Sequence, residues 1–326
     1  MIGPRAEVVR EVAAAFPEAR IEPLAGDAST RRFWRIRGAD GDTRVLMDYG
    51  KPFEDETDDV RLARIFREAG LPVAEVLDIW GPAGCILLED LGNTTLESAV
   101  VQPNGLRRPE ARELLERAVL LATRVAESGT AALARSDRRA GPALDSERFR
   151  FEMDYFLEHY ARGLRRCDPP PGLRSALHAL ADRAADTPRP VLCHRDFHSR
   201  NLMVRAGGGL AMVDVQDARW GPDCYDLASL VRDAYIEVDE WLDPLVELYV
   251  STLREPPPEG FHSRFRRVSA QRMLKALGTF GYQVAEREDL RYMSAIPRTV
   301  RRLNALLPSM TETRPLHDLL VSADLL

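Results

Sequence analysis

The sequence predicts an α+β protein with two lobes, a small β-rich N-lobe of residues 1–90 and a larger helical C-lobe of residues 91–326. Three observations predict this organisation. Up to residue 89, short β-like runs and turn residues surround one long helix. From residue 94 onward the apolar residues mostly follow helical spacing. With 326 residues, the chain is also long enough to bury two sizeable cores.

The N-lobe begins with an expected amphipathic helix over residues 1–16, where charged and apolar residues alternate at helical spacing. A second helix is expected over residues 58–69, because Gly70 and Pro72 supply a stop signal. The β-like runs give one extended segment and two hairpins, at residues 21–24, 33–37, 44–49, 76–80 and 85–88.

The C-lobe is expected to be helical with one small β-like island. Its first long helices are expected at residues 109–128, 146–165 and 173–185, the second opened by Ser146 as N-cap. The island comprises residues 191–193, 202–204 and 210–213, with three glycines at 207–209 as a turn. Helices are then expected to continue to residue 326.

Composition excludes several function classes. A net charge of −6 gives no global reason to bind nucleic acid or an anionic membrane. No stretch approaches the roughly 20 apolar residues that span a bilayer. The four cysteines form no CxxC pair and are expected to be free thiols in a reducing compartment. We therefore expect a cytoplasmic protein that binds neither nucleic acid nor membrane.

The chemistry concentrates between residues 194 and 226. Asp196 and Asn201 lie five residues apart, and Asp214 follows the next pair of β-like runs. A tight hairpin between them is expected to bring the three side chains to one mouth of a cleft. Phosphoryl transfer needs a carboxylate to orient the attacking hydroxyl and metal ions to neutralise phosphate oxygens. Asp196 suits the first role, and Asn201 and Asp214 offer oxygen ligands to Mg²⁺, although each alone also suits a capped turn.

The run His-Arg-Asp-Phe-His-Ser-Arg-Asn-Leu-Met at 194–203, with Val-Asp-Val-Gln-Asp-Ala at 213–218, resembles the aminoglycoside phosphotransferase/choline kinase superfamily. The likeness is strongest to the bacterial N-acetylmuramate/N-acetylglucosamine anomeric 1-kinases of cell-wall recycling. Segments 26–32, 45–48, 87–92 and 271–278 extend it over nearly the whole chain. The resemblance implies a protein-kinase-like two-lobe fold that uses ATP and Mg²⁺.

The resemblance also implies residue roles. Asp196 would be the catalytic base, Asn201 and Asp214 would hold the metal, and Asp226 would brace the catalytic loop. The nucleotide-binding residues that it implies are Gly26, Ser29, Thr30 and Arg31 over the phosphates, with Glu89 and Leu91 meeting the adenine through backbone groups.

One expected residue is missing. Kinases of this fold carry a lysine on the third strand that grips the α- and β-phosphates, but residues 44–49 contain none. The chain has only two lysines, Lys51 and Lys275. Either Lys51, just past this strand, or Arg35 on the preceding strand is a candidate substitute, and Lys51 equally suits a surface position.

A small hydroxyl compound is the expected acceptor. Only eleven residues separate Asp214 from Asp226, too few for the segment with which protein kinases dock a polypeptide. Residues 261–307 hold nine arginines and one lysine against three acids, which suits a neutral or anionic sugar if this segment lines the site and is otherwise a solvated helix face. The candidate acceptor-binding residues are Asp154, Arg200, Gln216, Asp217 and Trp220.

Two further groups are ambiguous from sequence. His198 suits either an orienter of the catalytic loop or a packed, hydrogen-bonded histidine. The aromatic residues at 151, 155, 156 and 160 share one helical face, which favours core packing over a platform for a sugar ring.

The leading prediction is transfer of phosphate from ATP to the anomeric hydroxyl of an N-acetylated amino sugar. The alternatives are a kinase of another small alcohol (an aminoglycoside, choline-like or homoserine-like compound) and a nucleotide-binding pseudokinase. The intact Asp196, Asn201 and Asp214 favour an enzyme, whereas the missing lysine favours a pseudokinase. The oligomeric state stays open.

Overall fold

The computed structural model describes residues 3–24, 31–39, 41–102, 107–136 and 141–326. The chain forms two compact units. The first comprises Met1–Thr94 with Met203–Gln216, and the second comprises Thr95–Leu202 with Asp217–Leu326. A single boundary near residue 90 does not describe this division, because a later segment returns to the first unit. The predicted nucleotide-binding residues Gly26, Ser29 and Thr30 lie outside the described residues.

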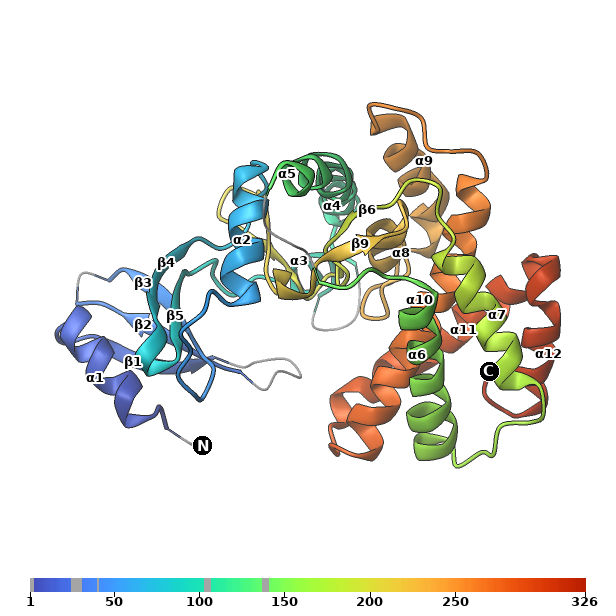
Figure 1. The fold of residues 1–326 in the computed structure, drawn as a ribbon, viewed down its shortest axis with the longest axis horizontal. Helices are drawn as coiled ribbons and strands as arrows, with labels where there is room; N and C mark the ends of the chain where they lie inside the picture. The colour runs from blue at the N-terminus through green and yellow to red at the C-terminus, as the bar shows by residue number, and fades with distance from the viewer. Residues whose placement is uncertain (1–2, 25–30, 40, 103–106, 137–140) are drawn as a thin grey trace. The chain divides into compact units, whose positions relative to one another are not determined.

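The first unit is built on a five-stranded antiparallel sheet in the order β1-β2-β3-β5-β4 (Figure 1). All five strands were predicted within one or two residues of their ends. They are β1 (Arg20–Leu24), β2 (Arg32–Arg37), β3 (Thr43–Asp48), β4 (Val76–Trp80) and β5 (Cys85–Glu89).

Each face of this sheet is covered by a helix. On one face, Trp34, Leu46 and Leu87 are paired across β2, β3 and β5, and they pack with Val8 and Val12 of α1 (Ala6–Ala15). On the other face, the neighbouring residues Met47 and Ile86 pack with Val60 of α2 (Asp58–Glu68). Because side chains alternate along a strand, one register supplies both cores.

A small hairpin completes the first unit. Strands β7 (Leu202–Val204) and β8 (Leu210–Met212) pair with each other, as predicted. The Val204 amide donates to the Thr94 carbonyl at 2.7 Å, and the Met212 amide donates to the Pro72 carbonyl at 2.8 Å. These bonds attach the hairpin to the chain just before β4 and just after β5.

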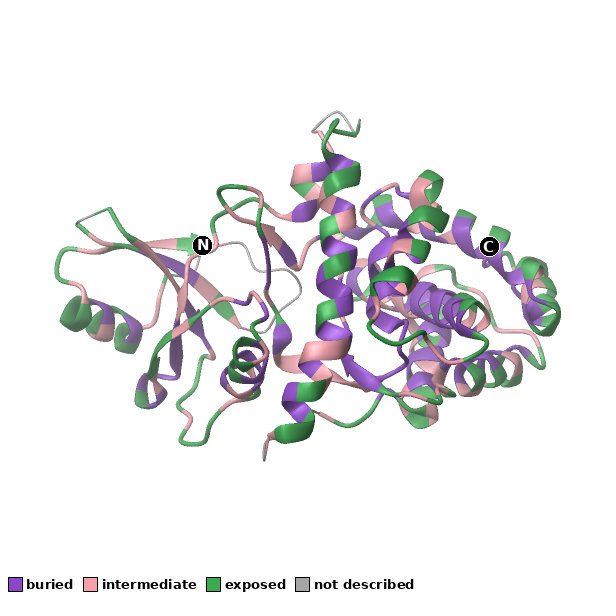
Figure 2. Cartoon of the chain, turned by 90° about the horizontal axis from the view of Figure 1, so that it is seen from above, coloured by how far each residue is buried: buried purple, intermediate pink, exposed green. Residues whose placement is uncertain are grey.

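The second unit is mostly helical, with the two-stranded sheet of β6 (Val191–Cys193) and β9 (Arg219–Gly221) inside it. Its helix faces turned inward are buried and those turned outward are exposed (Figure 2). The α-helices are α3 (Leu96–Val100), α4 (Ala111–Arg124), α5 (Thr130–Arg135), α6 (Ser146–Tyr155), α7 (Leu173–Ala185), α8 (Tyr225–Val231), α9 (Leu242–Thr252), α10 (Phe261–Ala285), α11 (Ile296–Leu306) and α12 (Arg314–Ser322).

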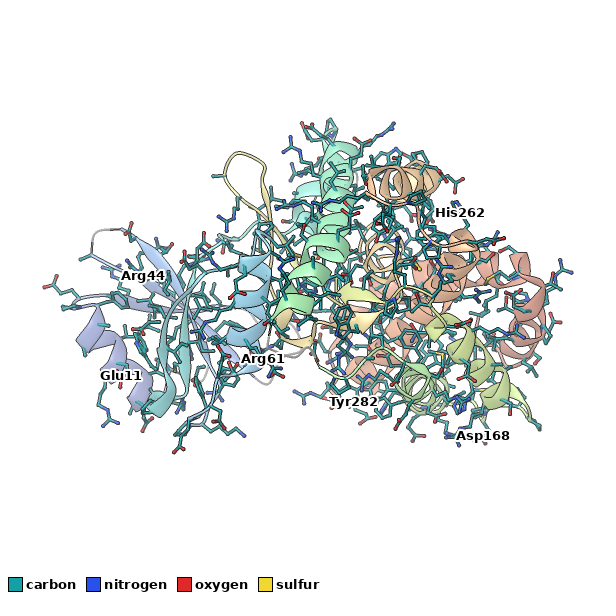
Figure 3. The ribbon with its side chains drawn as sticks, turned by 45° about the horizontal axis from the view of Figure 1, so that its top comes forward. Glu11, Arg44, Arg61, Asp168, His262 and Tyr282 are labelled. Carbon is teal, nitrogen blue, oxygen red and sulfur yellow. The ribbon has the colours of Figure 1, made fainter. Side chains whose placement is uncertain are left out.

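Helix α10 lies against the π-helical segment η3 (Phe156–Leu164), and the ring centroids of Tyr282 and His159 are 5.1 Å apart. The side chain of Tyr282 is labelled in Figure 3. The close approach requires glycine. A Cβ on Gly281 would stand 2.5 Å from the His159 carbonyl oxygen, which real Cβ atoms do not approach. Backbone contact between two helices is therefore built into this sequence position.

The α+β two-unit fold is confirmed, with local differences from the sequence expectations. The helix predicted over 146–165 is α-helical only to Tyr155 and continues as η3, and its N-cap is Asp145, whose carboxylate accepts from the Arg148 amide. The helix predicted over 109–128 similarly becomes π-helical at η2 (Val125–Gly129). Strand β9 was not predicted. Among the described residues, no helix is long and apolar enough to cross a membrane.

Candidate active site

The loop between β6 and β7 carries Asp196 and is fixed from behind by a buried carboxylate. Asp226, in the first turn of α8, accepts hydrogen bonds from the backbone amides of His194 at 2.7 Å and Arg195 at 3.0 Å. Burial raises the pKa of Asp226, against the effect of these hydrogen bonds. The predicted role of Asp226 as a brace of the catalytic loop agrees with these contacts.

Further bonds fix the loop beyond Asp196. The Ser199 amide donates to Asp233 at 2.7 Å, and the Asn201 amide nitrogen donates to the Asp196 carbonyl at 3.0 Å. Arg195 has a left-handed backbone conformation with φ of 79°, which is uncommon for a residue other than glycine and clusters at functional sites. The loop is therefore held in one shape by hydrogen bonds between its backbone and the side chains of Asp226, Asp233 and Asn201.

Two cations of α10 hold the Asp196 carboxylate. The Lys275 ammonium lies 2.8 Å from Oδ1, and Arg272 Nη1 lies 3.5 Å from the same atom. Burial disfavours ionisation of Asp196, but Lys275, Arg272 and Arg195 outweigh it and hold the pKa of this carboxyl well below its usual range. Asp196 is therefore a carboxylate at neutral pH. Among the described residues, none donates a hydrogen bond to Oδ2.

Lys275 itself is unusual because most of its side chain is removed from solvent, with only 15% exposed. Burial lowers the pKa of Lys275 to about 8, against the attraction of Asp196 and with the repulsion of Arg272 and Arg195. The ion pair with Asp196 is thus complete below pH 8 and weakens above it.

A pocket of about 90 Å³ opens beside this ion pair, within the second unit. One water molecule needs about 10–15 Å³, so the pocket accepts a group of a few heavy atoms. Cations outnumber acids by one in its wall, whose ionisable members are Asp196, His198, Arg232, Asp233, Arg272 and Lys275.

His198 is packed in this wall. Its side chain is half-buried, its ring contacts Tyr235 edge-on at 5.6 Å, and burial lowers its pKa. A neutral, packed histidine at neutral pH follows from this setting.

A charged cluster, buried at Arg195 and Glu152, supports the loop and α10. The guanidinium of Arg195 lies 3.1 Å from Asp217 and 3.5 Å from Glu152 of α6. Glu152 also accepts from Gln271 at 2.7 Å, and Asp217 pairs with Arg219 at 3.0 Å. Burial opposes ionisation of Asp217, but Arg195 and Arg219 lower its pKa. This network ties α6 and α10 to the catalytic loop.

In the first unit, Asp214 follows β8 and has a left-handed backbone with φ of 64°. Its carboxylate accepts from Arg31 Nη2 at 3.0 Å. Arg31 Nη1 lies 2.5 Å from Asp59 of α2, which also receives the Tyr49 hydroxyl. The strained conformation of a non-glycine residue at this position indicates a functional constraint on Asp214.

Asn201 and Asp214 each carry an oxygen donor of the kind that magnesium prefers. Among the described residues, no group of three or more His, Cys, Asp or Glu side chains could hold a metal by itself. Magnesium in kinases is held by one or two protein oxygens and completed by phosphates and water. Asp214 offers a carboxylate, and Asn201, whose amide nitrogen is used by Asp196, offers its amide oxygen.

The chain after β5 is clamped by Arg35. Its guanidinium binds Asp90 at 2.6 and 2.8 Å, Asn93 at 2.7 Å and the Gly92 carbonyl at 3.2 Å. The Glu89 side chain pairs with Arg205 at 3.1 Å, and Leu91 is half-buried. The backbone at residues 89–91 is thereby held in place, and its predicted contact with adenine stays a prediction.

The predicted acceptor residues are dispersed. None of the five lines the pocket beside Asp196. Asp154 faces α7, where it binds Arg174 at 2.7 Å and His178 at 2.9 Å. Arg200 pairs with Glu97 at 2.8 Å and stacks on Tyr235 at 3.6 Å. The other three follow one another along the chain: Gln216 in η4 (Val215–Asp217), Asp217 beside Arg195, and Trp220 in β9.

The aromatic group at 151–160 divides between core and surface. Phe156 and Tyr160 are fully buried and stacked at 5.3 Å, whereas the Phe151 side chain is 55% exposed. Core packing therefore accounts for two of the four rings.

The cationic excess of residues 261–307 is mostly neutralised in place. Arg264 pairs with Asp223 at 2.8 Å, and Arg302 binds Glu237 at 3.1 Å and Asp239 at 2.7 Å. The segment is thus neither a continuous cationic wall nor only a solvated face. From it, Arg272 and Lys275 are the cations that line the pocket.

Sequence reasoning did not assign roles to Lys275, Arg272 or Glu152. A signal existed for Lys275, since it is one of two lysines in a chain whose other basic residues are arginines. Nothing in the sequence marks Glu152, because only the packing of α6 against α10 brings it to Arg195.

A braced loop carrying an ionised aspartate, together with an Asp that follows a hairpin strand, defines a phosphotransferase of the protein-kinase-like fold. The chain belongs to the phosphotransferase enzyme family, whose model matches residues 20–260.

Two curated relatives have the same name, N-acetylmuramate/N-acetylglucosamine kinase. That of Neisseria meningitidis is 32% identical, covering 91% of this chain and 88% of the relative. That of Pseudomonas aeruginosa is 30% identical, covering 94% of this chain and 89% of the relative. The solved choline kinase LicA of Streptococcus pneumoniae shares the fold with a TM-score of 0.63 at 16% identity, over 92% of this chain and 98% of that one.

Proposed function

We propose that the protein transfers phosphate from ATP to the anomeric hydroxyl of N-acetylmuramate or N-acetylglucosamine, as a cytoplasmic step in the recycling of cell-wall sugars. The observation that carries this proposal is the ionised Asp196 beside a small, net cationic pocket. The names of relatives with about 30% identity over most of the chain support the same acceptor.

Asp196 acts by orienting the acceptor. Phosphoryl transfer depends mainly on positioning and on charge stabilisation. Because Lys275 and Arg272 hold Oδ1, the Oδ2 atom accepts the hydrogen bond of the sugar hydroxyl and aligns its oxygen with the phosphorus. The low pKa keeps Asp196 ready as an acceptor throughout the neutral range.

The donor side is assigned from the resemblance and from the nucleotide seen in a structurally similar chain, LicA with AMP. Asn201 and Asp214 are the proposed ligands of Mg²⁺, which when bound neutralises phosphate charge. Gly26, Ser29, Thr30 and Arg31 are proposed to contact the phosphates, and the backbone of Glu89 to Leu91 the adenine.

On the acceptor side, Gln216, Asp217 and Trp220 are proposed to contact the sugar. Asp154 and Arg200 are assigned structural roles instead, because each has ion-pair partners on a neighbouring helix. The pocket has room for a substituent of the size of an acetamido group rather than for a whole ring.

The charge of the pocket disfavours cationic acceptors. An aminoglycoside or a choline-like compound would bring positive charge toward Lys275 and Arg272, which already repel each other across Asp196. A neutral or anionic sugar avoids this repulsion, and the lactyl carboxylate of N-acetylmuramate would be attracted.

The test is turnover on a panel of acceptors. Purified protein with ATP and Mg²⁺ is incubated with N-acetylmuramate, N-acetylglucosamine, glucosamine, kanamycin, choline and homoserine, and ADP release and phosphorus NMR are recorded. We expect turnover on the N-acetylated sugars with an anomeric phosphate signal. Turnover on kanamycin or choline alone would overturn the sugar assignment, and nucleotide binding without any turnover would favour a pseudokinase.

A further inference from the structure

The cation missing from β3 has no substitute among the two residues that the sequence suggested. Arg35 is buried, and its guanidinium is fully engaged by Asp90, Asn93 and the Gly92 carbonyl. Lys51 lies in the loop after β3 and is exposed. Within the described part of the chain, the ion pair of Asp214 is made by Arg31 and by neither of these two residues.

A different cation already lies beside Asp214. Arg31 directly precedes β2, and its side chain is only 14% exposed. Its Nη1 is 2.5 Å from Asp59 Oδ1, and its Nη2 is 3.0 Å from Asp214 Oδ1. Burial disfavours its charge, but Asp59 and Asp214 outweigh burial and raise the pKa of Arg31, so the guanidinium stays charged.

The carboxylate of Asp59 is fixed in turn. It belongs to the first turn of α2, its side chain is 17% exposed, and it receives the hydroxyl of Tyr49 at the end of the β3 region. Arg31, Tyr49, Asp59 and Asp214 all belong to the first unit. The chain therefore holds a cation between a helix carboxylate and the Asp that follows the hairpin strand.

Kinases need this set of charges. Their strand lysine binds the α- and β-phosphates, is held by an acid of the neighbouring helix, and lies near the metal-binding Asp. Here the helix acid is Asp59 and the Asp after the strand is Asp214, while the cation enters from the residue before β2 instead of from β3.

On the basis of the proposed function, we propose that Arg31 replaces the strand lysine by binding the nucleotide phosphates, and that Asp59 is its positioning residue. A guanidinium suits this task because its two terminal nitrogens are used separately. Nη1 keeps its bond to Asp59 while Nη2 exchanges Asp214 for a phosphate oxygen. This exchange would leave the Asp214 carboxylate available to hold magnesium. The net charge of Asp59, Arg31 and Asp214 is negative, which leaves room for a bound cation.

The test measures ADP affinity by calorimetry, without an acceptor and without turnover. We expect Arg31→Gln to weaken ADP binding at least tenfold. The matched control is Arg32→Gln. Arg32 is the next residue and carries the same charge, but its side chain is exposed, so this variant should leave ADP affinity unchanged. Equal ADP affinity in the two variants would overturn the assignment of Arg31.

The positioning role of Asp59 is tested by removing and then restoring its negative charge. Asp59→Asn should weaken ADP binding about three- to tenfold, Asp59→Glu should restore most of it, and the acceptor KM should change in neither. Combining Asp59→Asn with Arg31→Gln should add little to the single Arg31 change, because the two act as a unit. Additive losses would overturn the positioning role.

Two controls separate the possible failures. Thermal unfolding without nucleotide, compared between the variants and the natural protein, identifies loss of folding. If the natural protein itself fails to bind ADP, the proposed kinase function is wrong. If it binds ADP and Arg31→Gln binds equally well, the kinase function stands and the inference about Arg31 is wrong.

Discussion

Lys275 and Asp196 form a part-buried ion pair, with the ammonium 2.8 Å from one carboxylate oxygen. The pair joins the middle of α10 to the catalytic loop across 79 residues of sequence. It gives the second unit a direct means of setting the position and the charge of Asp196, the proposed catalytic residue.

Replacing Lys275 by Met should lower kcat about 10- to 100-fold, because Asp196 loses the partner that fixes Oδ1. In the natural protein, kcat should fall as pH rises through about 8, since the ammonium is protonated below its pKa and neutral above it. This alkaline limb should be absent in Lys275→Met. Arg266→Met, an exposed change on the same helix, is the control. An unchanged alkaline limb would contradict the role of Lys275.

Replacing Asp196 by Asn should lower kcat about 10²- to 10⁴-fold, because the hydroxyl loses its orienting acceptor. Nucleotide binding should be largely retained, since Asp196 belongs to the second unit and the proposed phosphate contacts to the first. Steady-state kinetics and ADP calorimetry measure the two effects. Turnover near that of the natural protein would refute the assignment.

Replacing Asp226 by Asn should destabilise the fold by about 2–3 kcal/mol, because at least one buried backbone amide of the catalytic loop loses its acceptor. Urea unfolding followed by tryptophan fluorescence measures this. Asp318→Asn removes a carboxylate that is 81% exposed and should have no measurable effect. Equal stability of the two variants would show that the brace contributes little.

The charge of the pocket predicts a difference between two acceptors that differ by the lactyl carboxylate. Lys275→Met should raise the KM for N-acetylmuramate about fivefold more than the KM for N-acetylglucosamine, which corresponds to about 1 kcal/mol of charge attraction. Initial rates at varied acceptor concentration measure both values. Equal changes in the two KM values would place the carboxylate away from Lys275.

Replacing Gly281 by Ala should lower the melting temperature, because the new Cβ meets the backbone of His159. In an open helix the same change stabilises by about 1 kcal/mol, so the sign of the effect is informative. Gly209→Ala, where a Cβ meets nothing within 4 Å, is the control. A melting temperature at or above that of the natural protein would mean that α10 and η3 separate easily.

Local patterns predicted the sheet because strands show in alternation and turn residues, and the catalytic loop because its acids keep fixed spacing. The π-helical stretch of η3 was not predictable, since its pattern of apolar residues equals that of an α-helix. The ion-pair partners of Asp196 and Arg31 could not be predicted from the sequence either. Lys275 and Asp59 reach them only through tertiary packing, over separations of 79 and 28 residues. Asp154 shows a different failure. The sequence correctly placed it in a helix, but its carboxylate faces α7 and not the pocket beside Asp196.

The return of residues 203–216 to the first unit has a consequence for synthesis. A ribosome finishes the five-stranded sheet early, but it must add all of residues 95–202 before the hairpin that completes this unit emerges. At typical rates of 5–20 residues per second this delay is roughly 5–20 s. During that interval the carbonyls of Pro72 and Thr94 lack the hydrogen bonds that the amides of Met212 and Val204 later donate to them. During synthesis the first unit therefore lacks its hairpin. We expect a fragment that ends at Thr94 to fold completely only when a peptide of residues 203–216 is added.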